Sequence, residues 1–118
     1  MKFDKVNDSG ERREFETGAV RDIQTGKGRY DLLSPIAIKR LAQHMENGAA
    51  KYSDRNWEKR IPIHSFVDSA IRHLFNYLDG DKTEDHLAAA MWNCHCAIHT
   101  EVKKTEMQDI PSRVESKE

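Results

Sequence analysis

The sequence predicts an all-α fold: a small helical bundle that is completed by oligomerisation. Three segments between residues 34 and 100 carry apolar side chains at the period of about 3.6 residues that an α-helix requires. Each segment also starts close to a residue type that caps helices. No segment shows the apolar–polar alternation with β-branched residues that is typical of a half-buried strand. We therefore expect an ordered part made of helices alone.

The first predicted helix begins at Ser34-Pro35, with serine as N-cap and proline at the first helical position. Its apolar residues are Ile38, Leu41, Ala42, Met45 and Ala49. The helix should end near Tyr52, because Gly48 weakens its last turns. An irregular connector over residues 53–62, with Trp57 in its middle, then leads to the second helix.

The second predicted helix starts near His64-Ser65 and ends at Asp79-Gly80. Its apolar residues are Val67, Ala70, Ile71, Leu74 and Leu78. In the third helix, Thr83 is the expected N-cap, and Glu84 and Asp85 occupy the first turn, where the helix dipole favours acids. The expected apolar face of this helix consists of Leu87, Met91, Cys94 and Ile98.

The chain has 118 residues, which is enough for one small domain. We expect an all-α domain at 25–100, a polar N-terminal arm at 1–24 and a polar C-terminal tail at 101–118. An ordered part of under about 80 residues makes a marginal core when it stands alone. The sequence therefore predicts a homodimer or a homotetramer.

Charge and hydropathy exclude several classes of partner. The chain has 19 Lys and Arg against 20 Asp and Glu, whereas proteins that bind polymeric nucleic acid usually carry a basic excess. No apolar run approaches the roughly 20 residues of a membrane span, and the N-terminus lacks the pattern of a signal peptide. Cys94 and Cys96 diverge by about 200° on a helix, which excludes a disulfide between them. We expect a cytoplasmic protein that binds neither membranes nor polymeric nucleic acid.

A glycine-rich loop at residues 25–31 is the first candidate for binding a ligand. Lys27 and Arg29 stand beside two glycines, and Asp31 follows shortly before a helix start. Such a loop can cradle phosphate, since its arginine can grip two phosphate oxygens. The alternative is an ordinary flexible loop.

The second helix offers Asp68, Arg72 and His73. Asp68 and Arg72 are four residues apart, which is also the spacing of a solvated helix ion pair. His73 points about 140° away from Asp68 around the helix. His73 is therefore equally well interpreted as a hydrogen-bonded, half-buried histidine or as a ligand.

On the third helix His86, Ala89, Ala90 and Asn93 form one stripe. Small residues between two polar ends predict either a shallow groove for a ligand or a close contact between helices. A buried Asn93 requires a hydrogen-bond partner. His95 and His99 share a face of this helix, but Cys94 and Cys96 point elsewhere, so the sequence does not predict a structural zinc.

Several runs, in the same order, carry a resemblance to a known family. They are Arg29-Tyr-Asp-Leu-Leu-Ser-Pro35, Asn47-Gly-Ala-Ala-Lys-Tyr52, Asn56-Trp-Glu-Lys59, Arg72-His-Leu74 and Glu84-Asp-His-Leu-Ala-Ala-Ala-Met-Trp-Asn93. Over residues 21–100 the chain resembles the phage-type dATP/dGTP diphosphohydrolases, which belong with the MazG-like all-α nucleoside triphosphate pyrophosphohydrolases. That family commonly has glycine after the Asn-Trp-Glu-Lys run, where this chain has Arg60.

The resemblance implies hydrolysis of purine deoxynucleoside triphosphates to monophosphate and pyrophosphate, in phage nucleotide metabolism and hence in the host cytoplasm. It also implies Mg²⁺ or Mn²⁺ held by acids on bundle helices. The wider superfamily has Glu-x-x-Glu on one helix and Glu-x-x-Asp on the next, whereas this chain has Asp68, Arg72, His86 and Ala89 at those positions. The metal ligands expected here are Glu46, Asp68, Glu84 and Asp85.

From the same resemblance and from the chemistry of the residues we expect three catalytic residues: Asp68, Asp85 and His86. The residues expected to bind substrate are Lys27, Arg29, Asp31, Lys51, Asn56, Trp57, Arg72, His73 and Asn93. Two alternatives remain open at this point: a phosphoribosyl-ATP pyrophosphohydrolase-like enzyme, and a non-catalytic helical adaptor that kept the fold.

Overall fold

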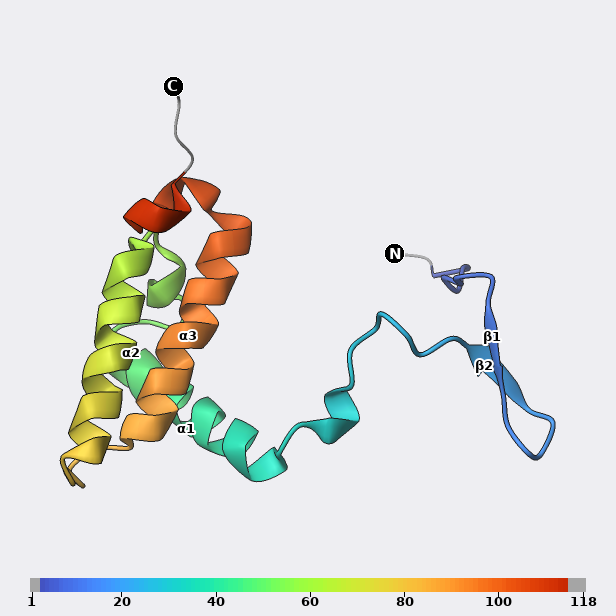
Figure 1. Ribbon diagram of the computed structural model, residues 1–118, viewed down its shortest axis with the longest axis horizontal. Coiled ribbons are helices and arrows are strands. Elements are labelled where there is room, and N and C mark those ends of the chain that lie inside the picture. Colours follow the sequence, from blue (N-terminus) through green and yellow to red (C-terminus); the bar gives the residue numbers. More distant parts are fainter. Residues whose placement is uncertain (1–2, 115–118) are drawn as a thin grey trace. The chain divides into compact units, whose positions relative to one another are not determined.

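The computed structural model describes residues 3–114, which fall into two compact units, one up to Leu33 and the other from Ser34 onward. The first unit contains two short strands and a 3₁₀ turn, and the second contains three α-helices (Figure 1). The prediction of a small all-α fold is confirmed for the larger unit. No helix of the described residues is both long and apolar enough to cross a membrane.

The first unit holds an antiparallel hairpin that the sequence pattern did not indicate. Strand β1 (Arg12–Glu14) pairs with β2 (Val20–Asp22), and Arg13 lies opposite Arg21. The turn between them uses Gly18 at a φ of +87°, a conformation that glycine adopts without strain. Because β1 is fully exposed and β2 nearly so, neither strand has a buried face, and the alternation signal is absent.

Helix α1 spans Pro35–Lys51 and begins as predicted. The Ser34 hydroxyl accepts a hydrogen bond from the backbone N–H of Ala37 at 3.2 Å, and Pro35 takes the first helical position. The helix ends where the N–H of Tyr52 donates to the carbonyl of Gly48. These contacts confirm both predicted ends of the helix.

The connector after α1 contains a 3₁₀ turn at Asn56–Glu58 that buries Trp57. Two residues later Arg60 has a φ of +42°, in the left-handed region that residues other than glycine rarely adopt. Arg60 therefore takes up, at some cost, the kind of backbone conformation that glycine adopts freely.

Helices α2 (Ile63–Leu78) and α3 (His86–Lys103) run side by side, and α1 also packs against α3 (Figure 1). The N-cap of α3 is Asp85, whose carboxylate accepts from the N–H of Ala88 at 3.2 Å. The expectation that Thr83 caps this helix is wrong. Thr83 instead donates its hydroxyl and its N–H to Asp81, which closes the turn before the helix.

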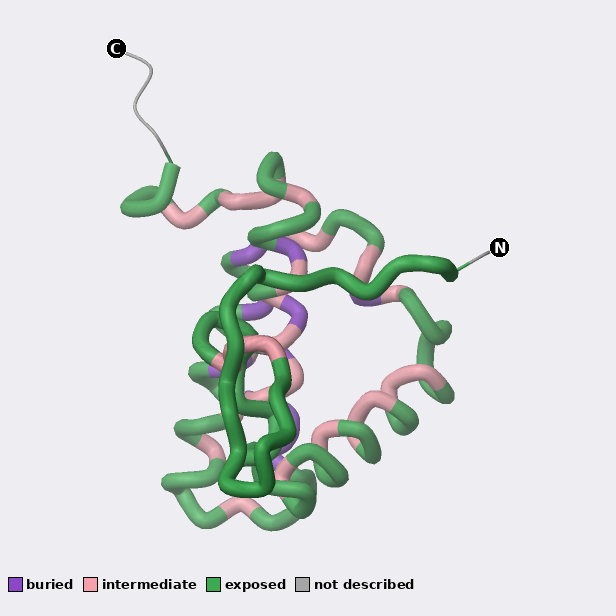
Figure 2. Tube along the Cα trace, turned by 90° about the vertical axis from the view of Figure 1, so that its right-hand side faces the viewer, coloured by how far each residue is buried: buried purple, intermediate pink, exposed green. Residues whose placement is uncertain are grey.

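The predicted apolar face of α3 is also wrong. Leu87, Cys94 and Ile98 are exposed, whereas the buried positions follow another stripe: His86, Ala88, Ala89, Ala90, Asn93, Cys96 and Thr100. Alanine side chains allow the neighbouring helices to approach closely, so small size, not hydrophobicity, selects this face. The buried stripe runs along the helical unit in Figure 2. Ala89 and Ala90 thus form a contact between helices and not an open groove.

The apolar core lies between the connector, α2 and α3. Trp57, Phe66 and Cys96 form its buried centre, and partly buried side chains from α1, the connector and α3 pack around them: Met45, Ile61, Trp92 and Ala97. Burial raises the pKa of the Cys96 thiol to about 12, so this cysteine is an inert core residue. After α3 the chain forms two 3₁₀ turns, at Thr105–Met107 and Pro111–Arg113.

Candidate functional site

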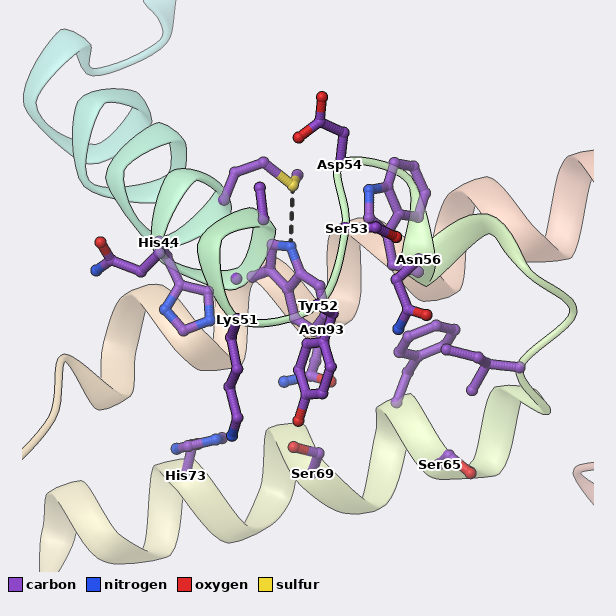
Figure 3. Close-up of a pocket in the computed structure, with 18 of the residues that line it drawn as sticks. His44, Lys51, Tyr52, Ser53, Asp54, Asn56, Ser65, Ser69, His73 and Asn93 are labelled. Atoms are coloured by element: carbon purple, nitrogen blue, oxygen red, sulfur yellow. Dashed lines mark hydrogen bonds between the residues drawn. The ribbon is translucent and has the colours of Figure 1, made fainter.

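A cavity of about 540 Å³ opens in the helical unit between the end of α1, the connector, α2 and α3 (Figure 3). Its volume is in the range of sites for small organic ligands. The periodicity of the sequence explains which residues reach it: Ser65, Ser69 and Arg72 recur at helical spacing on α2, and His44, Gly48 and Lys51 do so on α1. Helices α1 and α2 thus each turn one stripe of residues toward the same space.

One wall of the cavity is aromatic. Trp57 is 8% exposed and meets His95 and His99 edge-on, with ring centroids 5.2 Å and 4.9 Å away. Trp92 donates its indole N–H to the sulfur of Met45 at 3.2 Å. These contacts fix both indole rings, so the wall is rigid before any ligand arrives.

The cavity also carries two cationic side chains from different helices. Lys51 extends from the end of α1 toward α2 (Figure 3), and its ammonium lies 5.1 Å from the centre of the Tyr52 ring. Arg72 of α2 donates to Asp68 at 3.2 Å and to the hydroxyl of Ser69 at 3.3 Å. Lys51 and Arg72 together place positive charge beside the aromatic wall.

Asn93 is the buried amide of the site, with 4% of its surface exposed. Its side-chain N–H donates to the carbonyl of Ala89 at 2.9 Å, which fixes the orientation of the amide. The described residues supply no donor to its side-chain oxygen, and the residue lines the cavity. Asn93 can therefore accept a hydrogen bond from a ligand without losing its own.

Two histidines from neighbouring helices meet at one end of the cavity. The Nδ1 atoms of His73 and His86 lie 2.9 Å apart, and Nε2 of His86 lies 2.7 Å from the Asp81 carboxylate. Hydrogen bonding from His86 lowers the pKa of Asp81, so the carboxylate is ionised and accepts the Nε2 proton. Desolvation lowers the pKa of His73, which favours its neutral form.

Six of the nine side chains predicted to bind substrate line this cavity: Lys51, Asn56, Trp57, Arg72, His73 and Asn93. The other three lie in the first unit. There Lys27 pairs with Asp22 at 2.8 Å, and Arg29 pairs with Asp31 at 2.8 Å. Their charges are balanced locally, and all three side chains are exposed.

The structure does not gather the acids predicted to hold a metal. Glu84 lines the cavity, but Glu46 accepts from Gln43, Asp68 pairs with Arg72, and Asp85 caps α3. Within residues 3–114, the one group of three metal-ligating side chains with atoms inside 4.8 Å of each other is His73, Glu84 and His86. The sequence missed the roles of Asp81 and His44, although helical spacing to Lys51 could have placed His44 at the cavity.

The fold and the cavity define a small all-α domain whose cavity brings two cationic side chains, two indole rings and a buried amide together. The family model for the dATP/dGTP diphosphohydrolase, N-terminal domain matches residues 17–110, and the chain belongs to this family. Comparison with curated proteins and with solved structures found no match.

Proposed function

We propose that this chain hydrolyses the purine deoxynucleoside triphosphates dATP and dGTP to monophosphate and pyrophosphate. The observation that carries the proposal is the cavity itself, where two cations, two fixed indole rings and one buried amide meet in a member of this family. We place the chain among the MazG-like enzymes of phage nucleotide metabolism, as its sequence motifs suggest.

The base would lie against the aromatic wall. Trp57 offers an indole surface at the cavity, and stacking does not depend on the identity of the base. Asn93 would bind the edge of the base, because its free oxygen can accept from an exocyclic amino group. Adenine carries this group at C6 and guanine at C2, so the two purines would turn different edges toward the one amide. Cytosine carries an amino group as well, so a preference for purines would come from their double ring, which stacks on more of the indole surface than a single pyrimidine ring does.

The triphosphate would lie along Lys51 and Arg72. Binding an anion of about four charges by a chain with a net charge of -1 requires a local cluster of cations. Arg72 is already oriented by Asp68 and Ser69, so its guanidinium is held in place before the phosphates bind. Lys51 approaches from the opposite helix, which allows the two cations to hold the phosphates between them.

The resemblance to known enzymes implies Mg²⁺ or Mn²⁺ on carboxylates, and hard cations do prefer oxygen ligands. The four acids expected for this role do not fit such a site, because three of them are engaged with Gln43, Arg72 and Arg40 instead of converging.

The proposal is tested by incubating the protein with dATP, dGTP, dCTP or dTTP and a divalent cation and measuring pyrophosphate. We expect the purine substrates to react at least tenfold faster, which equals about 1.4 kcal/mol in the barrier. Lys51→Ala should impair turnover, whereas Lys39→Ala removes a lysine of the same helix outside the cavity and should not. Equal rates on all four substrates would contradict purine selection, and absence of pyrophosphate would contradict the function.

A further inference from the structure

We propose that His73, Glu84 and His86 form a binding site for a borderline transition-metal cation of the Zn²⁺, Co²⁺ or Ni²⁺ type. These residues come from the middle of α2, from the turn before α3 and from the first position of α3. One ligand atom from each lies within 4.8 Å of the others. The inference concerns metal binding as such and does not depend on the proposed hydrolysis.

The spacing of the two imidazoles fits a shared metal. With metal–nitrogen bonds of about 2.0–2.1 Å, two nitrogens that lie 2.9 Å apart subtend about 90° at the metal. This is the angle between neighbouring ligands of an octahedral ion. A tetrahedral ion would require the nitrogens to separate to about 3.3–3.4 Å. A small rotation of the half-buried His73 achieves that change.

The surroundings of His86 resemble those of a metal-binding histidine. His86 is 2% exposed, and its Nε2 donates to Asp81 at 2.7 Å, which leaves Nδ1 with its lone pair toward His73. Metal-bound histidines usually donate their second ring N–H to a carboxylate in this way. Asp81 is itself fixed by the N–H and the hydroxyl of Thr83, at 3.1 Å and 2.9 Å.

The donor set determines the class of metal. Two imidazole nitrogens and one carboxylate suit zinc, cobalt and nickel, whereas magnesium requires oxygen ligands. Both His73 and Glu84 line the cavity, so an ion can enter from there, while buried His86 forms the floor of the site. Its ligand His73 directly follows Arg72 in the sequence. The ion would therefore add positive charge to the end of the cavity that carries the cationic side chains.

The competing explanation is a plain hydrogen bond in which His73 Nδ1–H donates to Nδ1 of His86. The two accounts differ in a direct binding measurement. Untagged, EDTA-treated full-length protein is titrated with Co²⁺ while its visible absorption is recorded, and with Zn²⁺ and Mg²⁺ by calorimetry. We expect one Co²⁺ or Zn²⁺ per chain and an affinity for Zn²⁺ at least 100-fold above that for Mg²⁺.

Variants assign the ion to this cluster. His73→Ala should weaken Zn²⁺ binding at least 100-fold. Glu84→Gln should weaken it as well, and it tests the site without a change at buried His86, which could prevent folding. Asp81→Asn should weaken binding 10- to 100-fold through the orientation of His86. His99→Ala serves as the control for the second histidine pair, which packs on Trp57. Unchanged Zn²⁺ affinity in His73→Ala, or no Zn²⁺ binding by the wild type, would overturn the proposal. Zn²⁺ binding without pyrophosphate release would contradict only the proposed hydrolysis.

Discussion

Arg40 of α1 and Asp85 at the start of α3 form a two-point ion pair. Nε of Arg40 donates to one carboxylate oxygen at 2.8 Å, and a second guanidinium nitrogen donates to the other. The same carboxylate accepts from the N–H of Ala88 and caps α3. Both oxygens of a residue that the family resemblance implied as catalytic are therefore engaged in holding two helices together.

Asp85→Ala should destabilise the protein more than Asp85→Asn. Asparagine caps helices as well as aspartate does, so Asp85→Asn loses only the negative charge that pairs with Arg40, whereas alanine loses the cap as well. We expect the alanine variant to be about 1 kcal/mol less stable than the asparagine variant in urea unfolding. Equal unfolding midpoints would contradict the capping role.

The same ion pair makes stability depend on acid. Hydrogen bonding from Arg40 lowers the pKa of Asp85 in the folded protein below its value of 3.8 in the unfolded chain. A lowered folded pKa means that the stabilisation is complete above pH 3.8 and is lost as the pH falls through the folded pKa. Unfolding midpoints measured from pH 6 down to about pH 2 should therefore fall less steeply for Asp85→Asn than for the wild type.

Arg72→Ala and Asp68→Asn separate two roles for the charged pair on α2. Arg72 lines the cavity, whereas the Asp68 side chain is 77% exposed and contacts the guanidinium from outside. We expect Arg72→Ala to raise KM for dGTP at least tenfold and Asp68→Asn to raise it much less. If Asp68→Asn abolished turnover while its fold stayed intact, Asp68 would belong to the reaction site, as the family resemblance implies.

Arg60→Gly should stabilise the fold. Arg60 has a φ of +42°. This conformation costs a residue with a Cβ atom about 1 kcal/mol of backbone strain, which glycine does not incur. The variant also loses the ion pair with Glu106 at 3.1 Å, but exposed pairs of this kind contribute little. Arg60→Ala removes the ion pair and keeps the strain, so it is the matched control. A higher melting temperature for the alanine variant than for the glycine variant would contradict the role of the strain.

Helix α2 leaves an apolar stripe exposed, formed by Val67, Ile71, Leu74 and Leu78. Its helical spacing places the stripe on one face, as the sequence predicts, and the described residues of the helical unit leave that face exposed. We expect dimers or tetramers by light scattering at micromolar concentration. Ile71→Lys with Leu74→Lys should give monomers with unchanged helix content, whereas Val102→Lys, on α3, should not. A monomeric wild type with a cooperative melt would refute this.

Caps explain why the ends of α1 could be predicted from the sequence. Ser34 and Pro35 act within the first turn of the helix, so their effect depends little on the tertiary context. The same kind of signal at Thr83 failed, because Asp85 caps α3 instead. The buried face of α3 could not be predicted from hydrophobicity, because His86 and Asn93 are buried through hydrogen bonds and the alanines through their size.

The residues of the candidate site could likewise be predicted only in part. Side chains on one helix stripe, such as Arg72 and Asn93, could be selected from spacing and chemistry. The contact between His73 and His86 depends on how two helices pack across a turn, which no periodicity encodes. Asp85 has the chemistry of a catalytic acid, but its capping role and its partner Arg40, 45 residues away in the chain, are visible only in the structure.

The most direct test of the central claim, a purine nucleotide in this cavity, uses the two tryptophans of the chain. Trp57 and Trp92 both line the cavity, so their indole N–H signals in a two-dimensional NMR spectrum report on its contents. A non-hydrolysable dGTP analogue should shift both signals in a saturable manner, and the dCTP analogue at the same concentration should shift them far less. Unchanged indole signals with saturating dGTP analogue, or equal shifts with both analogues, would contradict the account.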